Sequence, residues 1–163
     1  IEKITHDTGS MALQCLIGSL AITPLRRLTG WNAVIGFRRM VGLFAFFYAA
    51  LHLLTYVVLD QFFDWPSIAG DLTKRPYIIA GAVGVGLLLP LAVTSTTGWI
   101  RRLGGRNWQR LHRLAYLAAI AGVVHFWWLV KADVTEPAVY GGVLAVLLGL
   151  RVWWAARRRM GRV

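Results

Sequence analysis

Long uninterrupted apolar segments dominate the hydrophobic pattern of this chain. A transmembrane helix needs about 20 mostly apolar residues, and the apolar-polar alternation typical of membrane-barrel strands is absent. Five segments are therefore candidate spans, at residues 8–24, 40–59, 77–100, 114–130 and 137–156. The pattern predicts an all-α fold, a polytopic transmembrane helical bundle that forms one domain over residues 1–163.

The outermost candidate spans are interrupted by polar side chains. Gln14 lies in the first span, and Arg151 lies near the end of the last. We expect the Arg151 side chain to extend toward the membrane surface, because long cationic side chains can keep their charge in water in this way.

The composition supports a membrane protein and excludes two kinds of cofactor site. Hydrophobic residues make up 57% of the chain and charged residues 15%, whereas about a quarter of a soluble domain is charged. The single cysteine, Cys15, can build neither a disulfide framework nor a thiolate metal site. The C-x-x-C-H motif that attaches haem covalently is absent.

The net charge of +11 is sorted between the two sides that the predicted spans would create. One side carries arginines without acids: Arg26, Arg27, Arg38, Arg39, Arg101, Arg102, Arg106, Arg110, Arg113, Arg151, Arg157, Arg158, Arg159 and Arg162. The other side carries all the acids: Glu2, Asp7, Asp60, Asp64, Asp71, Asp133 and Glu136. Cytoplasmic loops of membrane proteins are rich in Lys and Arg, so we expect the arginine-rich face to be cytoplasmic. The same sorting argues against a nucleic-acid partner.

Two histidines lie inside apolar segments at matching depth. His52 follows Arg39 by thirteen residues and His125 follows His112 by thirteen, so each lies about 20 Å from the cytoplasmic end of its helix. An ionisable residue within a span indicates a functional site, although a single imidazole can also bond a neighbouring helix. Two on facing helices predict a bis-imidazole site for haem b. A zinc or copper ion would require further ligands, and none is evident at that depth.

His112 lies at the cytoplasmic edge, and its role stays open. The residue at matching depth in the other helix is Arg39, and an ideal helix turns His112 roughly 140° away from His125. His112 could hold a second haem with an unusual partner, contact a quinone or flavin, or bind no cofactor. Trp108 and Arg110 are candidates for a flavin or quinone site beside it, because arginines suit a flavin phosphate; they suit anionic membrane lipid equally well.

Small and hydroxylated residues in the third span suggest local packing roles. Gly81, Gly84 and Gly86 permit close approach of another helix. The hydroxyls of residues 94–97 follow Pro90, and we expect them to bond carbonyls that the proline leaves free.

Four stretches of the chain resemble the MsrQ (YedZ) family of haem-binding membrane subunits, within the ferric-reductase-like transmembrane superfamily. They are RRMVGLFAFFYAALHLLTYV, LTKRPYIIAGAVG, LAVTSTTGWIRRLGGRNWQRLHRLAYLAAIAGVVHFWW and LRVWW. The resemblance extends from about His6 to Arg158 and implies haem b, one or two per chain, associated with His52, His112 and His125. It also implies FMN and six spans, and because the chain begins with Ile we expect a further span upstream.

The resemblance also implies a role in electron transfer. Members sit in the bacterial inner membrane and receive electrons from the quinol pool or a cytoplasmic flavin reductase. They pass them to MsrP, a periplasmic molybdopterin enzyme that reduces methionine sulfoxide. The chain would thus be an electron-transfer subunit rather than the catalytic one, and it lacks the G-x-G-x-x-G fingerprint and NADPH domain of ferric reductases and NADPH oxidases.

Two alternatives remain at the level of sequence. One is a haem-free transporter or membrane assembly protein with structural histidines. The scarcity of acids within the spans argues against a proton-coupled carrier. The other is a respiratory quinol-oxidising cytochrome b with a different partner.

Overall fold

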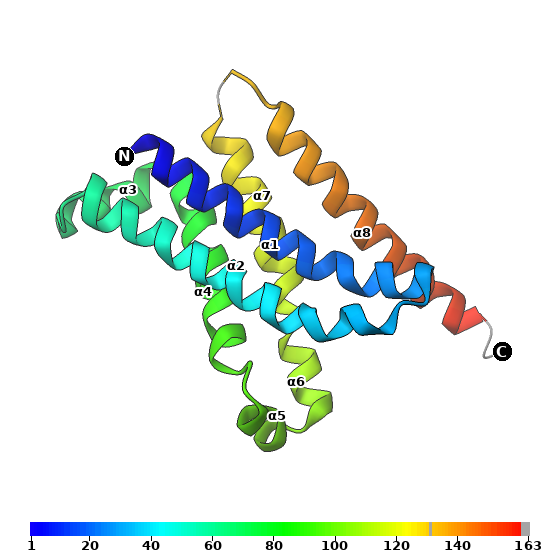
Figure 1. Ribbon diagram of the computed structural model, residues 1–163. Coiled ribbons are helices and arrows are strands. Elements are labelled where there is room, and N and C mark those ends of the chain that lie inside the picture. The colour runs from blue at the N-terminus through cyan, green and yellow to red at the C-terminus, as the bar shows by residue number, and fades with distance from the viewer. Residues whose placement is uncertain (131, 161–163) are drawn as a thin grey trace.

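A computed structural model describes residues 1–130 and 132–160, and these residues form helices joined by short turns, with no strand among them (Figure 1). The α-helices are α1 (Glu2–Thr29), α2 (Phe37–Leu54), α3 (Trp65–Lys74), α4 (Pro76–Val93), α5 (Thr97–Leu103), α6 (Gly105–Leu111), α7 (Leu114–Leu129) and α8 (Thr135–Met160). A 3-10 helix, η1 (Asn32–Gly36), precedes α2, and a π-helix, η2 (Thr55–Asp60), continues it.

Among the described residues, four helical segments are long and apolar enough to cross a membrane: Glu2–Thr29, Asn32–Asp60, Pro76–Val93 and Thr135–Arg158. They contain most of four of the five predicted spans. The prediction of an all-α polytopic bundle is confirmed.

The remaining predicted span, 114–130, is helical but shorter. It forms α7, whose 16 residues extend about 24 Å. A turn at His112 and Arg113 separates α7 from α6, so the helix does not continue toward the arginine-rich end.

The structure corrects two span boundaries. Helix α1 continues beyond the predicted end at residue 24 to Thr29, where Gly30 adopts a left-handed conformation with φ 73° and ends the helix. Helix α4 ends at Val93 instead of residue 100. The Thr94 hydroxyl donates to the Pro90 carbonyl at 2.6 Å and the Ser95 hydroxyl donates to the Leu91 carbonyl at 2.6 Å. These hydroxyls bond carbonyls of the last turn of α4, as expected of hydroxyls at this position. The predicted cause is wrong, because the missing N–H of Pro90 frees the carbonyl of Gly86 and not those of Pro90 or Leu91.

The bundle is built from two closely packed helix pairs, α1 with α2 and α4 with α7, and α8 packs on α1 and α7 (Figure 1). Leucines of α1 fill the centre, and small residues such as Ala49 and Ala119 let α2 and α7 approach it. Large apolar side chains such as Phe47 and Val146 are exposed on the outside. Such a surface suits a lipid environment.

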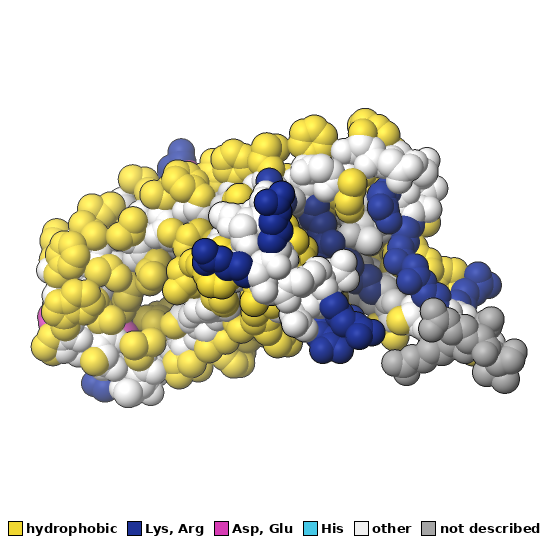
Figure 2. All heavy atoms as spheres, turned by 90° about the horizontal axis from the view of Figure 1, so that it is seen from below, with side chains coloured by type: hydrophobic (Ala, Val, Ile, Leu, Met, Phe, Trp, Pro, Cys, Tyr) yellow, Lys and Arg dark blue, Asp and Glu magenta, His cyan; other side chains and the backbone are white. Residues whose placement is uncertain are grey.

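The two ends of the bundle differ in charge. The N-terminus, α3 and the first turn of α8 lie toward one end, whereas α5, α6 and the last turns of α1 and α8 lie toward the other (Figure 1). Figure 2 shows most Lys and Arg side chains of one face gathered over one half, with hydrophobic side chains covering the other half. The predicted sorting of arginines toward one side is thus present in the folded structure.

Candidate functional site

The imidazole rings of His52 and His125 lie next to each other in the bundle. His52 belongs to α2 and His125 to α7, and their ring centroids are 5.9 Å apart with the ring planes at 82°. Their matched depth in sequence predicts this proximity. Both side chains are half-buried.

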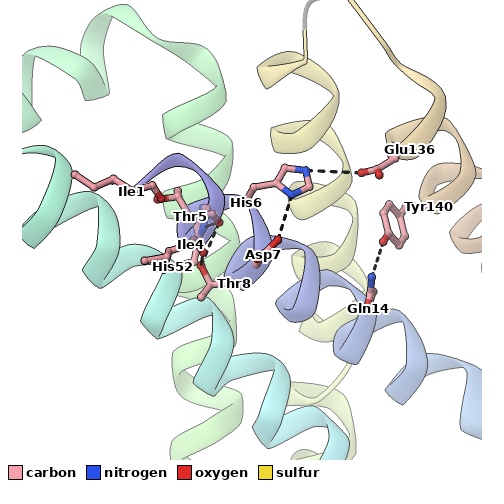
Figure 3. Close-up of polar contacts among 10 residues, drawn as sticks. All are labelled: Ile1, Ile4, Thr5, His6, Asp7, Thr8, Gln14, His52, Glu136 and Tyr140. Carbon is pink, nitrogen blue, oxygen red and sulfur yellow. Dashed lines mark hydrogen bonds and ion pairs between the residues drawn. The ribbon is translucent and has the colours of Figure 1, made fainter.

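Each of these histidines is held by a backbone carbonyl of the helix that pairs with its own. Nδ1 of His52 donates to the Thr5 carbonyl of α1 at 2.9 Å, and Nδ1 of His125 donates to the Tyr77 carbonyl of α4 at 2.6 Å (Figure 3 shows the first). A carbonyl oxygen only accepts, so Nδ1 carries the proton in both rings. Nε2 is then the nitrogen with a lone pair for a metal, an arrangement that orients metal-binding histidines in many proteins.

A glycine follows each of these carbonyls by four residues and lies against the same ring. A Cβ on Gly9 would come within 3.0 Å of Nδ1 of His52, and a Cβ on Gly81 within 2.8 Å of Nδ1 of His125. The two helix pairs therefore hold their histidines in the same way. A carbonyl and a glycine one turn apart hold a histidine from the neighbouring helix.

Hydroxyl groups extend this support around His52. The Thr55 hydroxyl donates to the His52 carbonyl at 2.8 Å, and the Thr5 hydroxyl donates to that of Thr55 at 3.3 Å. Thr55 is the first residue of the π-helix η2, and π-helical turns are common at functional sites.

A network of polar side chains includes the hydroxyl of Tyr77. The buried carboxylate of Asp71 accepts from the Tyr56 hydroxyl at 2.9 Å and pairs with Nε of Arg75 at 3.1 Å. Arg75 in turn donates to the Tyr77 hydroxyl at 3.3 Å. The network connects α3 to the first turn of α4, whose Tyr77 carbonyl holds His125.

The separation of the two ring centroids is compatible with two imidazole ligands of one haem iron. Metal–imidazole nitrogen bonds are about 2 Å long, so an iron between two imidazoles would separate their centroids by about 6 Å. The observed 5.9 Å agrees with this. In the described part of the chain, no group of three or more His, Cys, Asp or Glu side chains could hold a bare metal ion.

His6 does not join the pair. Its ring lies 3.9 Å from Asp7 and 3.8 Å from Glu136 and meets Phe126 edge-on, at the surface between α1 and α8 (Figure 3). A hydrogen bond from Gln14 to Tyr140, at 2.8 Å, joins the same two helices.

His112 forms a separate group with Trp108 near the arginine-rich end. The rings stack with centroids 3.8 Å apart, and Nδ1 of His112 donates to the Trp108 carbonyl at 3.0 Å. Trp108 itself donates from Nε1 to the Thr94 carbonyl at 2.8 Å. Nε2 of His112 is buried without a hydrogen-bond partner among the described residues.

The arginines around this group differ in how far they are buried. Burial lowers the pKa of His112, and the charge of nearby Arg38 lowers it further, although the bond to Trp108 opposes both. Arg38 is half-buried, whereas Arg39, the residue at matching depth in sequence, is exposed. Arg110 lies exposed on α6.

The expectation for Arg151 is wrong. Its guanidinium turns into the bundle, where Nη1 donates to the Tyr116 hydroxyl at 2.8 Å and Nη2 donates to the Leu20 carbonyl at 2.6 Å. These acceptors come from α7 and α1, so this single side chain joins three helices. Helical spacing alone cannot reveal such acceptors.

The known proteins to which this chain is similar belong to one family. Residues 8–123 match a family described as the ferric reductase like transmembrane component. A protein from Xanthomonas euvesicatoria pv. vesicatoria, named protein-methionine-sulfoxide reductase heme-binding subunit MsrQ, is 56% identical over 99% of this chain and 75% of its own length. Proteins of the same name from Xanthomonas axonopodis pv. citri and Rhodospirillum rubrum are 57% and 54% identical, over 94% and 98% of this chain and 70% and 76% of their own lengths.

Proposed function

We propose that this chain, which belongs to the MsrQ group of the ferric-reductase-like transmembrane family, is a membrane b-type cytochrome. It would carry electrons to the catalytic subunit of a methionine sulfoxide reductase. The pairing of the His52 and His125 rings at 5.9 Å carries the proposal. The names of the relatives, which specify a heme-binding subunit, support it.

His52 and His125 would hold the haem through Nε2. Haem supplies one-electron chemistry at its iron, and two imidazole ligands leave no open position for oxygen. The Thr5 and Tyr77 carbonyls keep both rings in the tautomer that presents Nε2, and the hydrogen bonds hold their orientation. Rigid ligands reduce the reorganisation that accompanies each electron transfer.

The charge distribution supports an orientation in the inner membrane. With the arginine-rich end in the cytoplasm, the end that carries Thr5, Tyr77 and the acidic turns faces the periplasm. The histidine pair then lies closer to a periplasmic partner such as MsrP than to the cytoplasm. The acidic turns around Asp64 and Asp133 would form part of the docking surface.

The group at the arginine-rich end would receive electrons. The stacked Trp108 and His112 rings, the unpartnered Nε2 of His112 and the nearby Arg38 suit a quinol, a flavin such as FMN, or a second haem. Arg110 could contribute a charge at its edge. Quinol or a cytoplasmic flavin reductase would be the donor.

A visible difference spectrum of the purified protein, reduced with dithionite, tests the proposal. Sharp b-type bands should appear in the wild type, and those of the haem held by this pair should be lost in His52→Ala and in His125→Ala. They should persist in His6→Ala, which removes an imidazole of the same end of the bundle that lies outside the pair. Folded protein supplied with haem but lacking these bands would favour the haem-free transporter.

A second measurement tests the direction of transfer. The reduced protein is mixed with the catalytic methionine sulfoxide reductase and methionine sulfoxide, and the b-type bands should decay as the substrate is consumed. Retention of the reduced bands, with a catalytic subunit shown to be active with an artificial donor, would instead favour a respiratory cytochrome with another partner.

A further inference from the structure

An open cavity of about 530 Å³ lies between the final turns of α1 and α8. Its lining is almost entirely cationic, and consists of Arg26, Arg27, Trp154, Arg157 and Arg158. The cavity belongs to neither the histidine pair nor the His112 group. We propose that it binds the phosphodiester headgroup of an anionic phospholipid.

Four guanidinium groups meet at this cavity without a compensating acid. The ion pairs of the described residues involve Asp7, Asp71 and Glu136, all at the opposite end of the bundle. The negative ends of the α1 and α8 dipoles offset part of the positive charge, since both helices end here. A bound anion would remove the remaining repulsion between the arginines.

Two of the arginines are positioned by indole rings. The guanidinium of Arg27 lies 4.8 Å from the ring centroid of Trp154, and that of Arg157 lies 4.6 Å from that of Trp153. A guanidinium over an aromatic face keeps the N–H groups in its own plane available. Those groups match the bidentate geometry that phosphate oxygens prefer. The stacking therefore prepares both side chains for a phosphate before one arrives.

The location of the cavity favours a lipid over a free anion. Both helices that form it are long and apolar enough to cross the membrane, and tryptophans near the end of such a helix mark the membrane–water interface. Exposed Val152 lies on α8 about one and a half turns before Arg157 and Arg158, on the membrane side of the cavity, where an acyl chain would run. Basic pockets of this kind between membrane helices bind anionic headgroups. Four guanidinium groups suit two phosphodiesters better than one, so we expect cardiolipin to bind more tightly than phosphatidylglycerol.

Native mass spectrometry of the full chain in detergent tests the proposal. The probes are cardiolipin, phosphatidylglycerol and zwitterionic phosphatidylcholine. The double variant Arg26→Gln/Arg158→Gln removes two cavity charges that take no part in the stacking on tryptophan. The matched control, Arg101→Gln/Arg106→Gln, removes two exposed arginines of the same end on α5 and α6. Retained secondary structure by circular dichroism shows that each variant is folded.

The wild type should retain cardiolipin under conditions that remove phosphatidylcholine. The cavity variant should bind it about tenfold more weakly or worse, with the control within about twofold of the wild type. Equal weakening in both variants would overturn the proposal, because it would indicate surface charge without a site. Displacement of cardiolipin by an equal concentration of inorganic phosphate would overturn it as well, because a free anion would then suffice.

Discussion

A Cβ on Gly81 would lie 2.8 Å from Nδ1 of His125, closer than side-chain atoms normally approach. The imidazole occupies the space that the side chain of any other residue at position 81 would fill. The Tyr77 carbonyl of the same helix, α4, accepts a hydrogen bond from this imidazole. The same relationship joins Gly9 and His52 on the other helix pair. The candidate site thus depends on two glycines as well as two histidines.

Gly81→Ala should displace the ring of His125 and reduce the haem content severalfold. The nearest atoms, Nδ1 and Cε1, lie on the ring edge that bonds to Tyr77, so the ring cannot move aside without losing that hydrogen bond. Haem per protein, counted by pyridine haemochrome, is the measurement. Gly86→Ala on the same helix is the control, because a Cβ there meets nothing within 4 Å. Equal haem in both variants would contradict the tight packing.

His112→Ala should leave the b-type bands of the haem held by His52 and His125. His112 precedes His125 by thirteen residues, which corresponds to about 20 Å along a helix axis. Its own hydrogen bond is to the Trp108 carbonyl. The difference spectrum should retain bands that His125→Ala abolishes. Complete loss of haem from a folded His112→Ala variant would show that one cofactor depends on both groups.

Arg151→Gln should destabilise the bundle by about 2 kcal/mol, the range for hydrogen bonds to charged groups. The change removes the bonds to Tyr116 and Leu20 that connect α8 to α7 and α1. Thermal unfolding in detergent measures the effect. Arg158→Gln, which removes an exposed arginine of the same helix, should unfold close to the wild-type temperature. Identical melting of the two variants would show that the internal bonds contribute little.

Asp71→Asn should lower the melting temperature by several degrees. The buried carboxylate serves Tyr56 and Arg75 together, and an amide retains neither the charge nor both acceptor oxygens. Asp60→Asn at an exposed position is the control. A double-mutant cycle with Tyr56→Phe isolates the hydroxyl–carboxylate bond. Additive effects of the two changes would mean that this bond does not couple them.

The sequence by itself determined the bundle, the depth of the histidines and the sorting of charge. Each of these depends only on the positions of residues along the chain. A span must be apolar over a fixed length, residues at equal distances along parallel helices lie at equal depth, and arginines are costly to move into lipid. His52 and His125 could therefore be paired before their helices were placed.

Only the tertiary structure decided which groups support these residues. The acceptor of His52 is 47 positions away and that of His125 is 48 positions away, and both are backbone carbonyls, which every residue carries. Residue type therefore gives no signal for them. Arg151 shows the same limit. Its position near a helix end suggests the membrane surface, but the Leu20 carbonyl and the Tyr116 hydroxyl, brought together by packing, bond its guanidinium inside the bundle.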